Sequence, residues 1–435
     1  MTYSEIGRLL AKKDHEIKFE TKGEPMKKIH KALLFISIIA AVFINTSAFA
    51  TNGMRLIGFG PIQNSMGGVS VGLPLDSAAV LSNPAGMGTL PGRIDFGASY
   101  FKPSVNYKAT ESAGMGGAVI GSNGKTIDSD RGASPIPAFG LIVPINKDFK
   151  FGIGAYGIAG MGVDYAKNLY GGITNSAYSQ MRFAPGLSYK INDMLSVGAA
   201  LNMMYATMEF NAAGGFGQEA HMGASSLGYG ATLGLLLKPI DMLQVGLAYE
   251  TKSSFQDFSF NTSAGTDKMA FNQPSVATIG FGLKPIEGLV VGFDIQWIRW
   301  SETNGNNLPS YTQNASSAMP WNLNWDDQLV YKIGVQYTVN PAVAVRAGYN
   351  YGKMPLNKDR AFENIAFPAI AEQHFTAGIG INLTKQFTLN FGGVYSPSAT
   401  LTGSNAGFPP AGQAINSYET SMSQYSIDTG LSYVF

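Results

Sequence analysis

The last eleven residues of the chain, Tyr425-Ser-Ile-Asp-Thr-Gly-Leu-Ser-Tyr-Val-Phe435, alternate between two kinds of side chain. One set is mostly apolar or aromatic and consists of Tyr425, Ile427, Thr429, Leu431, Tyr433 and Phe435. The residues between them are small or polar, apart from Val434. Successive side chains of a β-strand point to opposite faces, so this period of two predicts a strand with one apolar face.

The same two-faced pattern occurs fourteen times along the chain. Most of these segments reach the roughly 9–11 residues that a tilted strand needs to cross a bilayer, and an even number of strands is typical of bacterial outer-membrane barrels. The predicted strands are 93–103, 135–145, 149–162, 178–191, 195–210, 225–238, 243–257, 273–284, 289–301, 326–339, 343–354, 371–383, 387–396 and 424–435.

Short and long connections alternate between the predicted strands. Seven connections are long, from about 15 to 31 residues, and six are short: 146–148, 192–194, 239–242, 285–288, 340–342 and 384–386. Outer-membrane barrels have short periplasmic turns and long external loops. We therefore predict an all-β fold, a fourteen-stranded antiparallel transmembrane β-barrel over residues 93–435. A soluble β-sandwich would explain the alternation, but not apolar faces with so little charge on all fourteen segments.

The composition agrees with a barrel and excludes several other classes. Only 14% of the residues are charged, against roughly 25% in a soluble domain. Lysine and arginine number 30 and acidic residues 29, which argues against a nucleic-acid-binding protein. Cysteine is absent, so the chain has no disulfide, thiolate metal site or cysteine nucleophile. A mean hydropathy of +0.04 is too low for a bundle of membrane helices.

Residues 26–50 have the features of a secretory signal peptide. Three lysines precede a 13-residue apolar stretch, and Ala48-Phe49-Ala50 is a cleavage site of the A-x-A type. We interpret residues 1–25 as an over-extended start or a leader. Cleavage after Ala50 would remove eight basic and five acidic residues and leave a slightly acidic mature chain. A membrane anchor is the alternative, although the apolar stretch is short for one.

Residues 51–92 lack strand periodicity and are rich in Gly, Ser, Ala, Pro and Met. Their apolar side chains need burial, and the lumen of the barrel offers a place for it. Many glycines lie on the predicted inward faces, where they let another backbone approach closely. We therefore predict that this segment is a hatch that plugs the lumen. The alternative is a periplasmic extension, with glycines that ease the twist of the strands.

The third predicted strand contains a break in its period. Its inward glycines are Gly152 and Gly154, and the next glycine is Gly157, three residues on. An inserted residue in a strand is a β-bulge, which bends the strand and frees backbone groups. We therefore predict a kink at Ala155-Tyr156-Gly157. The alternative is that the strand ends here and a loop begins.

The run Asn83-Pro84-Ala85-Gly86 resembles the hatch motif of the FadL/TodX family, outer-membrane transporters of long-chain fatty acids and aromatic hydrocarbons in Gram-negative bacteria. Weaker similarities follow in order along the mature chain, at Pro185–Asp193, Trp300–Ser301, Val345–Tyr349 and Glu372–Gly378. Together they identify the chain as a member of this family.

The resemblance implies a monomeric barrel that takes up ligand passively. The mature N-terminus, Thr51-Asn52-Gly53, would close a pocket for a hydrophobic ligand, and the kinked third strand would open a gap through which the ligand leaves into outer-membrane lipid. The terminal aromatic residue Phe435 is similar to the signal that outer-membrane barrels present to their assembly machinery.

The resemblance also implies that a fatty-acid ligand would be held by basic lumen residues. Lys190 lies in the matching motif near a turn, and Arg182 and Arg346 lie on inward faces. The alternative for each cation is a lumen salt bridge with an acidic residue, Asp294, Glu250 or Asp428. An apolar route in which no basic side chain is positioned to bind a carboxylate would suit hydrocarbons as well as fatty acids.

Two other classes of function are alternatives to transport. A general or small-solute diffusion porin would need an open, charged channel, and a surface adhesin or phage receptor would use the loops. The predicted mature chain has two histidines, His221 and His374. Neither forms a recognisable pattern with a serine nucleophile and an acidic residue, so no enzyme is predicted. The sequence indicates no cofactor, no metal site and no nucleic-acid partner.

Overall fold

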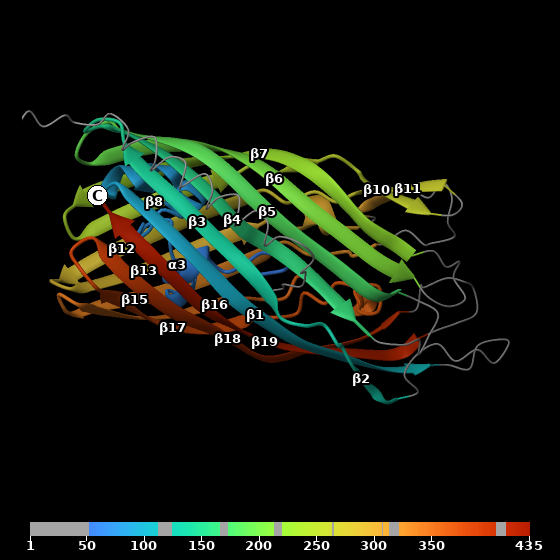
Figure 1. Ribbon diagram of the computed structural model, residues 1–435. Coiled ribbons are helices and arrows are strands. Elements are labelled where there is room, and N and C mark those ends of the chain that lie inside the picture. Colours follow the sequence, from blue (N-terminus) through green and yellow to red (C-terminus); the bar gives the residue numbers. More distant parts are fainter. Residues whose placement is uncertain are drawn as a thin grey trace, which may run out of the picture. The chain divides into compact units, whose positions relative to one another are not determined.

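The computed structural model describes residues 52–111, 124–165, 173–212, 220–262, 265–306, 308–312, 322–405 and 415–435. The predicted signal peptide and Thr51 lie outside these ranges. Fourteen antiparallel strands form a closed ring, as predicted (Figure 1). They are β1 Arg93–Glu111, β3 Ser134–Pro144, β4 Phe149–Asp164, β5 Ile173–Lys190, β6 Leu195–Ala212, β7 Ala220–Ile240, β8 Leu243–Glu250, β12 Val276–Ile286, β13 Leu289–Ile298, β15 Gln328–Asn340, β16 Val343–Gly352, β17 Gln373–Asn382, β18 Phe387–Asn405 and β19 Ile415–Val434.

The ring closes between its first and last strands. β19 pairs with β1 in continuous register from Arg93 opposite Val434 to Thr110 opposite Ser417. Every other barrel strand pairs with its neighbours in chain order. Closure pairs the first strand of the ring with the last, so neither is left as an open edge in lipid, where its backbone groups would lack partners.

The strands follow the predicted segments, and some of them extend further on the loop side. β1, β5, β6, β7, β18 and β19 are 18 to 21 residues long, well beyond the length needed to cross a bilayer. β8, in contrast, ends at Glu250, before the predicted end of that strand at residue 257. The short β9 (Ser254–Phe255) continues this wall against β7, and β2 (Thr126–Asp128) pairs with β1 beyond the residues that pair with β3.

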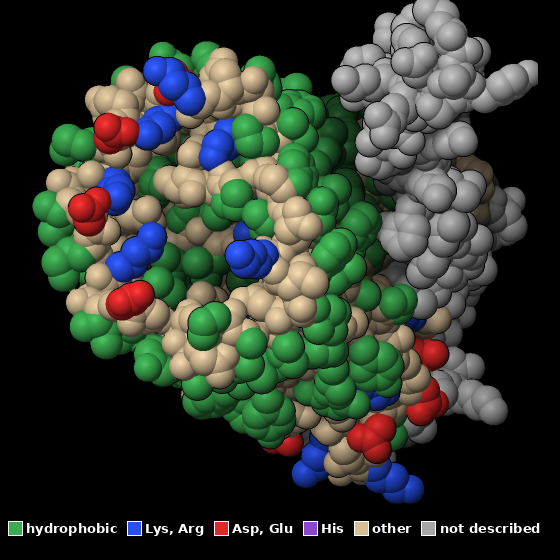
Figure 2. Space-filling view, turned by 60° about the vertical axis from the view of Figure 1, so that its left-hand side comes forward, with side chains coloured by type: hydrophobic (Ala, Val, Ile, Leu, Met, Phe, Trp, Pro, Cys, Tyr) green, Lys and Arg blue, Asp and Glu red, His purple; other side chains and the backbone are tan. Residues whose placement is uncertain are grey.

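The outer face of the wall is apolar. Leu187, Leu233, Leu329, Phe391 and Ile427 are each more than 40% exposed, and alternating residues of the same strands are buried polar groups. Figure 2 shows hydrophobic side chains over the wall and charged side chains gathered where the short turns lie. The distribution matches a lipid-facing barrel with a polar rim.

The remaining elements lie in the loops and in the N-terminal segment. A separate three-stranded sheet joins two loops and consists of β10 Phe258–Thr262, β11 Gly265–Ala270 and β14 Ser310–Thr312. The helices are short: α3 Gly60–Ser65, α4 Ala79–Ser82, η1 Pro84–Thr89, α5 Ser301–Asn304 and η2 Lys358–Arg360. Within the described part of the chain, no helix has the length and apolar character needed to span a membrane.

Residues 52–92, which we call the lumen segment, lie against the inward faces of the strands. Helix α3 contacts β16 to β19 together with β1 and β3, and η1 contacts β4 to β7, so the segment reaches around the ring (Figure 1). Gly67 has φ +67°, and a Cβ there would stand 2.8 Å from backbone atoms of Ile333 and Tyr349. Only glycine allows this approach of backbone to backbone.

Candidate functional site

The wall is interrupted where β4 leaves β3. Pairing between these strands ends at Ala138 opposite Tyr156, although β3 continues to pair with β1 on its other side. On the β5 side of β4, the register shifts between Gly157 and Ala159. The irregularity therefore falls at Ile158, next to the predicted kink at Ala155-Tyr156-Gly157 and one residue beyond it. A β-bulge at this position bends β4 away from its neighbour.

The two halves of β4 differ in burial. Residues before Tyr156 alternate between buried and partly exposed, as in the rest of the wall. From Tyr156 to Val163 every residue is buried. Both faces of this half-strand are thus covered by protein, so it no longer forms part of the lipid-facing surface.

The start of the lumen segment takes the place of β3 beside this half of β4. The Leu56 N–H donates to the Ile158 carbonyl and the Gly160 N–H donates to the Met54 carbonyl, each at 3.0 Å. We call residues 52–56 the N-terminal strand. Unpaired backbone groups are costly away from water, and the N-terminal strand satisfies those that the departure of β3 leaves open.

Two of the three predicted stopper residues are described, and both are buried. Asn52 is fully buried and exchanges backbone hydrogen bonds with Arg55. Gly53 has φ +65°, and a Cβ there would come within 2.5 Å of the Trp300 ring. Glycine is therefore required for both conformation and space. Thr51 lies outside the described residues.

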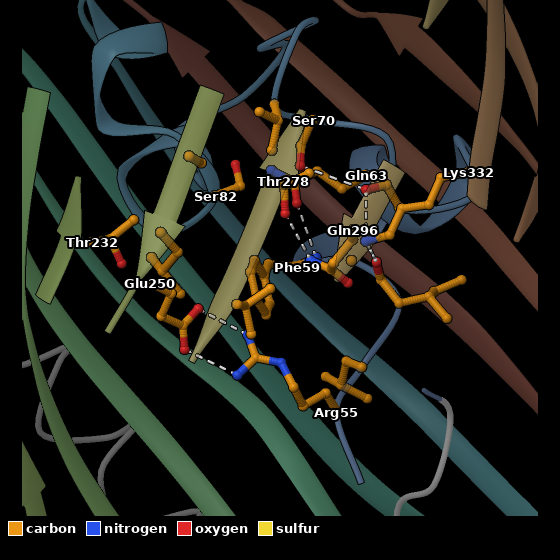
Figure 3. A pocket seen from close by; sticks show the side chains of 18 residues that line it. Arg55, Phe59, Gln63, Ser70, Ser82, Thr232, Glu250, Thr278, Gln296 and Lys332 are labelled. Carbon is orange, nitrogen blue, oxygen red and sulfur yellow. Dashed lines mark hydrogen bonds and ion pairs between the residues drawn. The ribbon is translucent and has the colours of Figure 1, made fainter. Parts of the chain in front are cut away.

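A buried ion cluster joins the N-terminal strand to two barrel strands. Arg55 donates from Nη1 and Nη2 to the two carboxylate oxygens of Glu250, each at 2.9 Å (Figure 3). Arg182 of β5 also donates to Glu250, on β8. All three side chains are at least nine-tenths buried. For Arg182, the structure therefore contains a lumen salt bridge, the alternative to a role in binding a ligand carboxylate.

The other two predicted carboxylate partners lie elsewhere. The Lys190 Nζ pairs with Asp193 Oδ1 at 2.6 Å in the turn after β5, and its ammonium lowers the pKa of Asp193. Lys190 thus lies at the polar rim, near the short turn after β5. Arg346 donates to Gln336 at 2.7 Å and to Asn390 at 3.1 Å. The three cations do not form a common site.

The cavity beside the ion cluster is small and polar. It has a volume of about 30 Å³ and is lined by residues that include Arg55, Glu250, Thr278, Gln296 and Lys332 (Figure 3). A cavity of this size holds about two water molecules and is too small for an apolar ligand. The Lys332 Nζ donates to the Ile57 carbonyl at 2.9 Å, which fixes the lumen segment at this point.

An apolar region lies on the loop side of the N-terminal strand. We call it the aromatic cluster, and it contains Met54, Tyr178, Phe271, Trp300, Trp325 and Phe367, each no more than 1% exposed. The rings of Tyr178 and Phe271 are 5.0 Å apart, and those of Phe271 and Phe367 are 6.0 Å apart. The cluster is continuous with Ile158 and Met161 of β4. Apolar contacts therefore run from the loops to the interruption in the wall.

Sequence reasoning missed the aromatic cluster. Phe271, Trp325 and Phe367 lie between strands, where no periodicity shows which side chains are buried. The signal in the sequence was that several large aromatic residues lie outside the strands. Such side chains are usually buried against a partner surface, which would have indicated a cluster.

The predicted hatch motif holds the other end of the lumen segment. Asn83 caps η1 by accepting from the Ala85 N–H at 3.2 Å, and it donates to the carbonyls of Val71 at 2.8 Å and Leu235 at 3.1 Å. Pro84 occupies the first turn of η1. A Cβ at Gly86 would stand 2.8 Å from the Pro74 ring. The motif thus fastens the segment to β7.

One carboxyl group of the lumen segment is strongly perturbed. Asp76 accepts hydrogen bonds from Gln63 and from the Ala78 N–H, both at 3.1 Å. Burial, reinforced by the nearby carboxylate of Asp95, raises the pKa of Asp76 to about 7. Asp95 itself pairs with Arg93 at 2.7 Å. A single arginine is therefore shared electrostatically by two carboxyl groups.

Solved structures with the same fold include a FadL homologue and two toluene transporters. A Pseudomonas aeruginosa FadL homologue has a TM-score of 0.73 and 16% identity, over 88% of this chain and 100% of its own. The Pseudomonas putida toluene transporter TodX has a TM-score of 0.69 and 20% identity, over 87% and 99%. The Ralstonia pickettii toluene transporter TbuX has a TM-score of 0.62 and 19% identity, over 87% and 99%. Identities this low support the fold alone.

The family assignment rests on the sequence. No curated protein matches the chain. The family described as "Outer membrane protein transport protein (OMPP1/FadL/TodX)" matches residues 37–407, which is most of the sequence. The fourteen-stranded barrel agrees with this match, and the chain therefore belongs to the FadL/TodX family of outer-membrane transport proteins.

Proposed function

We propose that this protein carries hydrophobic small molecules, long-chain fatty acids or related hydrocarbons, passively across the outer membrane, with a lateral exit between β3 and β4. The observation that carries the proposal is the interruption after Tyr156, filled by the N-terminal strand. The apolar contacts that run from the aromatic cluster to Ile158 support it. FadL/TodX family membership supports the substrate class.

The proposed path has three stages. Ligand leaves the long loops for the aromatic cluster, where it replaces side-chain contacts with contacts of its own. The N-terminal strand, with Thr51 to Gly53 as the stopper, then moves away from Ile158 and Gly160. The ligand passes through the gap into lipid. The free energy of an apolar molecule falls when it leaves water for apolar surroundings, and this route keeps it away from water. No other energy source is therefore needed.

The decisive experiment locks the N-terminal strand in place. Leu56 packs against the cluster of Phe101 and Ile136, and the chain has no native cysteine, so Leu56→Cys with Ile136→Cys is chosen to form a disulfide between the N-terminal strand and β3. Uptake of radiolabelled oleate and of toluene is measured in cells before and after reduction. Oxidation should lower the uptake rate of the variant at least tenfold, and reduction should restore the rate.

The matched control closes the wall where no gap exists. Phe96→Cys with Phe139→Cys joins β1 to β3 at residues that lie opposite each other in the register. Its uptake should stay within twofold of the unmodified protein in both redox states. Equal uptake by the oxidised Leu56–Ile136 variant would contradict the lateral exit.

A second measurement separates transport of hydrophobic molecules from a diffusion porin. In planar bilayers the protein should give no stable single-channel conductance, because the lumen segment packs against the strands and the cavity beside Arg55 has a volume of only about 30 Å³. Large, steady conductance steps would favour a porin instead.

A deletion tests the stopper. Removal of Thr51 to Gly53 should change the uptake of hydrophobic molecules, whereas unchanged uptake would contradict the stopper role.

The proposal includes a monomer that is assembled through its C-terminus. Within the described residues, the first and last strands of the ring pair with each other, so neither offers an edge to a second copy. Phe435 is 52% exposed, and its N–H donates to the Gly92 carbonyl at 3.0 Å. Its ring is therefore accessible on the turn side. Replacing Phe435 with Ser should lower the amount of assembled barrel without changing uptake per assembled molecule.

A further inference from the structure

The connection between β16 and β17 folds inward. We call residues 353–372 the mouth loop. Eight consecutive residues, from Asn364 to Ala371, are buried. Loops at the end of a barrel normally lie on the surface, where water satisfies their backbone groups. The burial of this loop therefore requires partners within the protein.

The mouth loop crosses the lumen to the opposite wall. The Ser176 hydroxyl of β5 donates to the Ala366 carbonyl at 2.5 Å. β5 lies seven strands from β16 in either direction around the fourteen-stranded ring. Because strands of a closed barrel are evenly spaced, seven strands is half the circumference. Ala366 thus reaches the wall directly across from the base of its own loop.

On its near side, the mouth loop is held by hydrogen bonds at its start, and further bonds follow toward Ala366. Two residues before Ala366, Asn364 accepts from the Trp325 Nε1–H at 2.6 Å and donates to the Leu323 carbonyl at 3.0 Å. The Asp326 N–H donates to the Pro355 carbonyl at 2.8 Å, and the Asn357 side chain donates to the Asn324 carbonyl at 2.7 Å. These bonds join the loop to the segment just before β15, which neighbours β16.

Across the mouth, the contacts are of another kind. Beyond the hydrogen bond from Ser176, Phe367 packs on Phe271 with ring centroids 6.0 Å apart. Apolar contacts are not directional, and a hydrophobic ligand can replace them. The near side therefore has the character of a hinge and the far side that of a latch.

We propose that the mouth loop is a lid over the aromatic cluster, hinged near Pro355 and Asn357 and latched to β5 at Ser176, and that a hydrophobic ligand enters when the latch opens. The inference rests on the proposed transport function, since it names the step that admits the ligand. It places a second closure on the loop side, distinct from the N-terminal strand on the way out. With both closed, the aromatic cluster is sealed, as its burial indicates.

The first test locks the latch. Ser176→Cys with Ala366→Cys is joined by a short bis-thiosulfonate cross-linker in a chain without other cysteines. Cross-linking should lower uptake of oleate and toluene at least tenfold, and reductant should restore it. The control is Ser179→Cys with Thr207→Cys, whose native hydroxyls lie 2.8 Å apart on β5 and β6 and which joins two neighbouring wall strands. Its uptake should not change on cross-linking.

The second test reads the lid without transport. Phe271→Cys places a thiol beneath the lid, and N-ethylmaleimide labels it at a rate set by opening. Adding Ser176→Ala should raise that rate at least fivefold, because it removes the latch hydrogen bond. Adding Ser179→Ala instead should leave the rate unchanged. Heat-modifiable migration on gels checks that each variant is folded.

The outcomes distinguish the two proposals. Unchanged labelling in the Ser176→Ala variant, or full uptake after cross-linking of Ser176→Cys with Ala366→Cys, would overturn the lid. Faster labelling in a protein that takes up neither oleate nor toluene would support the lid and contradict the transport function. Faster labelling together with a reversible block of uptake would support both.

Discussion

The half of the lumen near the short turns and the half near the long loops are both filled with chain, but by different contacts. Near the turns, backbone of the lumen segment lies directly on backbone of the strands, as at Gly67 and Gly348. Near the loops, the mouth loop meets its neighbours through aromatic side chains, as Phe367 does with Phe271.

The difference separates a fixed part from a part able to move. A glycine at which an added Cβ would lie within 3 Å of other backbone atoms is closely packed, and such packing fixes both partners. Aromatic side chains can rotate and be replaced by other apolar groups at modest cost. We therefore expect ligand passage to rearrange the loop half while the turn half stays in place.

The largest effect is expected at the border between the two halves. Glu250→Leu leaves Arg55 and Arg182 buried without their carboxylate, which should lower the free energy of unfolding by about 3–5 kcal/mol. Urea unfolding in detergent micelles measures it. Replacing all three residues together with Leu and Met should recover most of the loss, since no charge remains buried. Equal losses in the single and triple variants would show that charge is not the cause.

The next effect tests the rigidity of the turn half. Gly67→Val introduces a Cβ 2.8 Å from the backbone of Ile333 and Tyr349 at a φ of +67°, so strain and overpacking should together cost about 3 kcal/mol. The melting temperature of the barrel reports it. Gly132→Val, at an exposed glycine with nothing within 4 Å, is the control and should change little. Similar losses in both variants would remove the contrast between the halves.

A smaller effect on stability is expected in the loop half. Phe367→Leu keeps a buried apolar side chain in the mouth loop. The free energy of unfolding should therefore fall by only about 1.5 kcal/mol. Uptake should nevertheless change severalfold, because Phe367 contacts Phe271 where the ligand enters. Uptake assays beside melting curves separate the two readouts. A loss of stability as large as that of Gly67→Val would show that both halves are equally rigid.

The smallest effect is a pH dependence in the turn half. With its pKa raised from 3.8 to about 7, Asp76 holds its proton more tightly in the folded protein than in the unfolded chain. Its contribution to stability is therefore greatest below pH 3.8 and is lost as the pH rises through 7. Between pH 6 and 8 the loss should be about 1 kcal/mol. Melting curves of Asp76→Asn should lack this slope; if the slope persists, another group is responsible.

Much of the barrel followed from the sequence because strand periodicity is local. A two-residue alternation marks each strand and its lipid-facing side, and all fourteen predicted strands occur within a few residues at most ends. The break at Gly157 was visible for the same reason, although the spacing of glycines could not tell that the shift falls at Ile158.

The site residues were harder to predict. An inward-facing cation looks alike in sequence whether it binds a ligand, pairs with an acid or lies at the rim. Arg182 pairs with Glu250, which is 68 residues away, whereas Lys190 pairs with Asp193 at the rim. Only the closed ring places these side chains, because it decides which inward positions face each other.

By itself, the sequence determined the strands with their apolar faces, the alternation of turns and loops, and the motif Asn83 to Gly86. Each of these features depends only on residues that are close together in the sequence. The tertiary structure alone decided how the lumen is filled. The Arg55–Glu250 pair spans 195 residues and the Ser176–Ala366 hydrogen bond spans 190. Such contacts depend on the circumference and closure of the whole ring, and no local pattern encodes them.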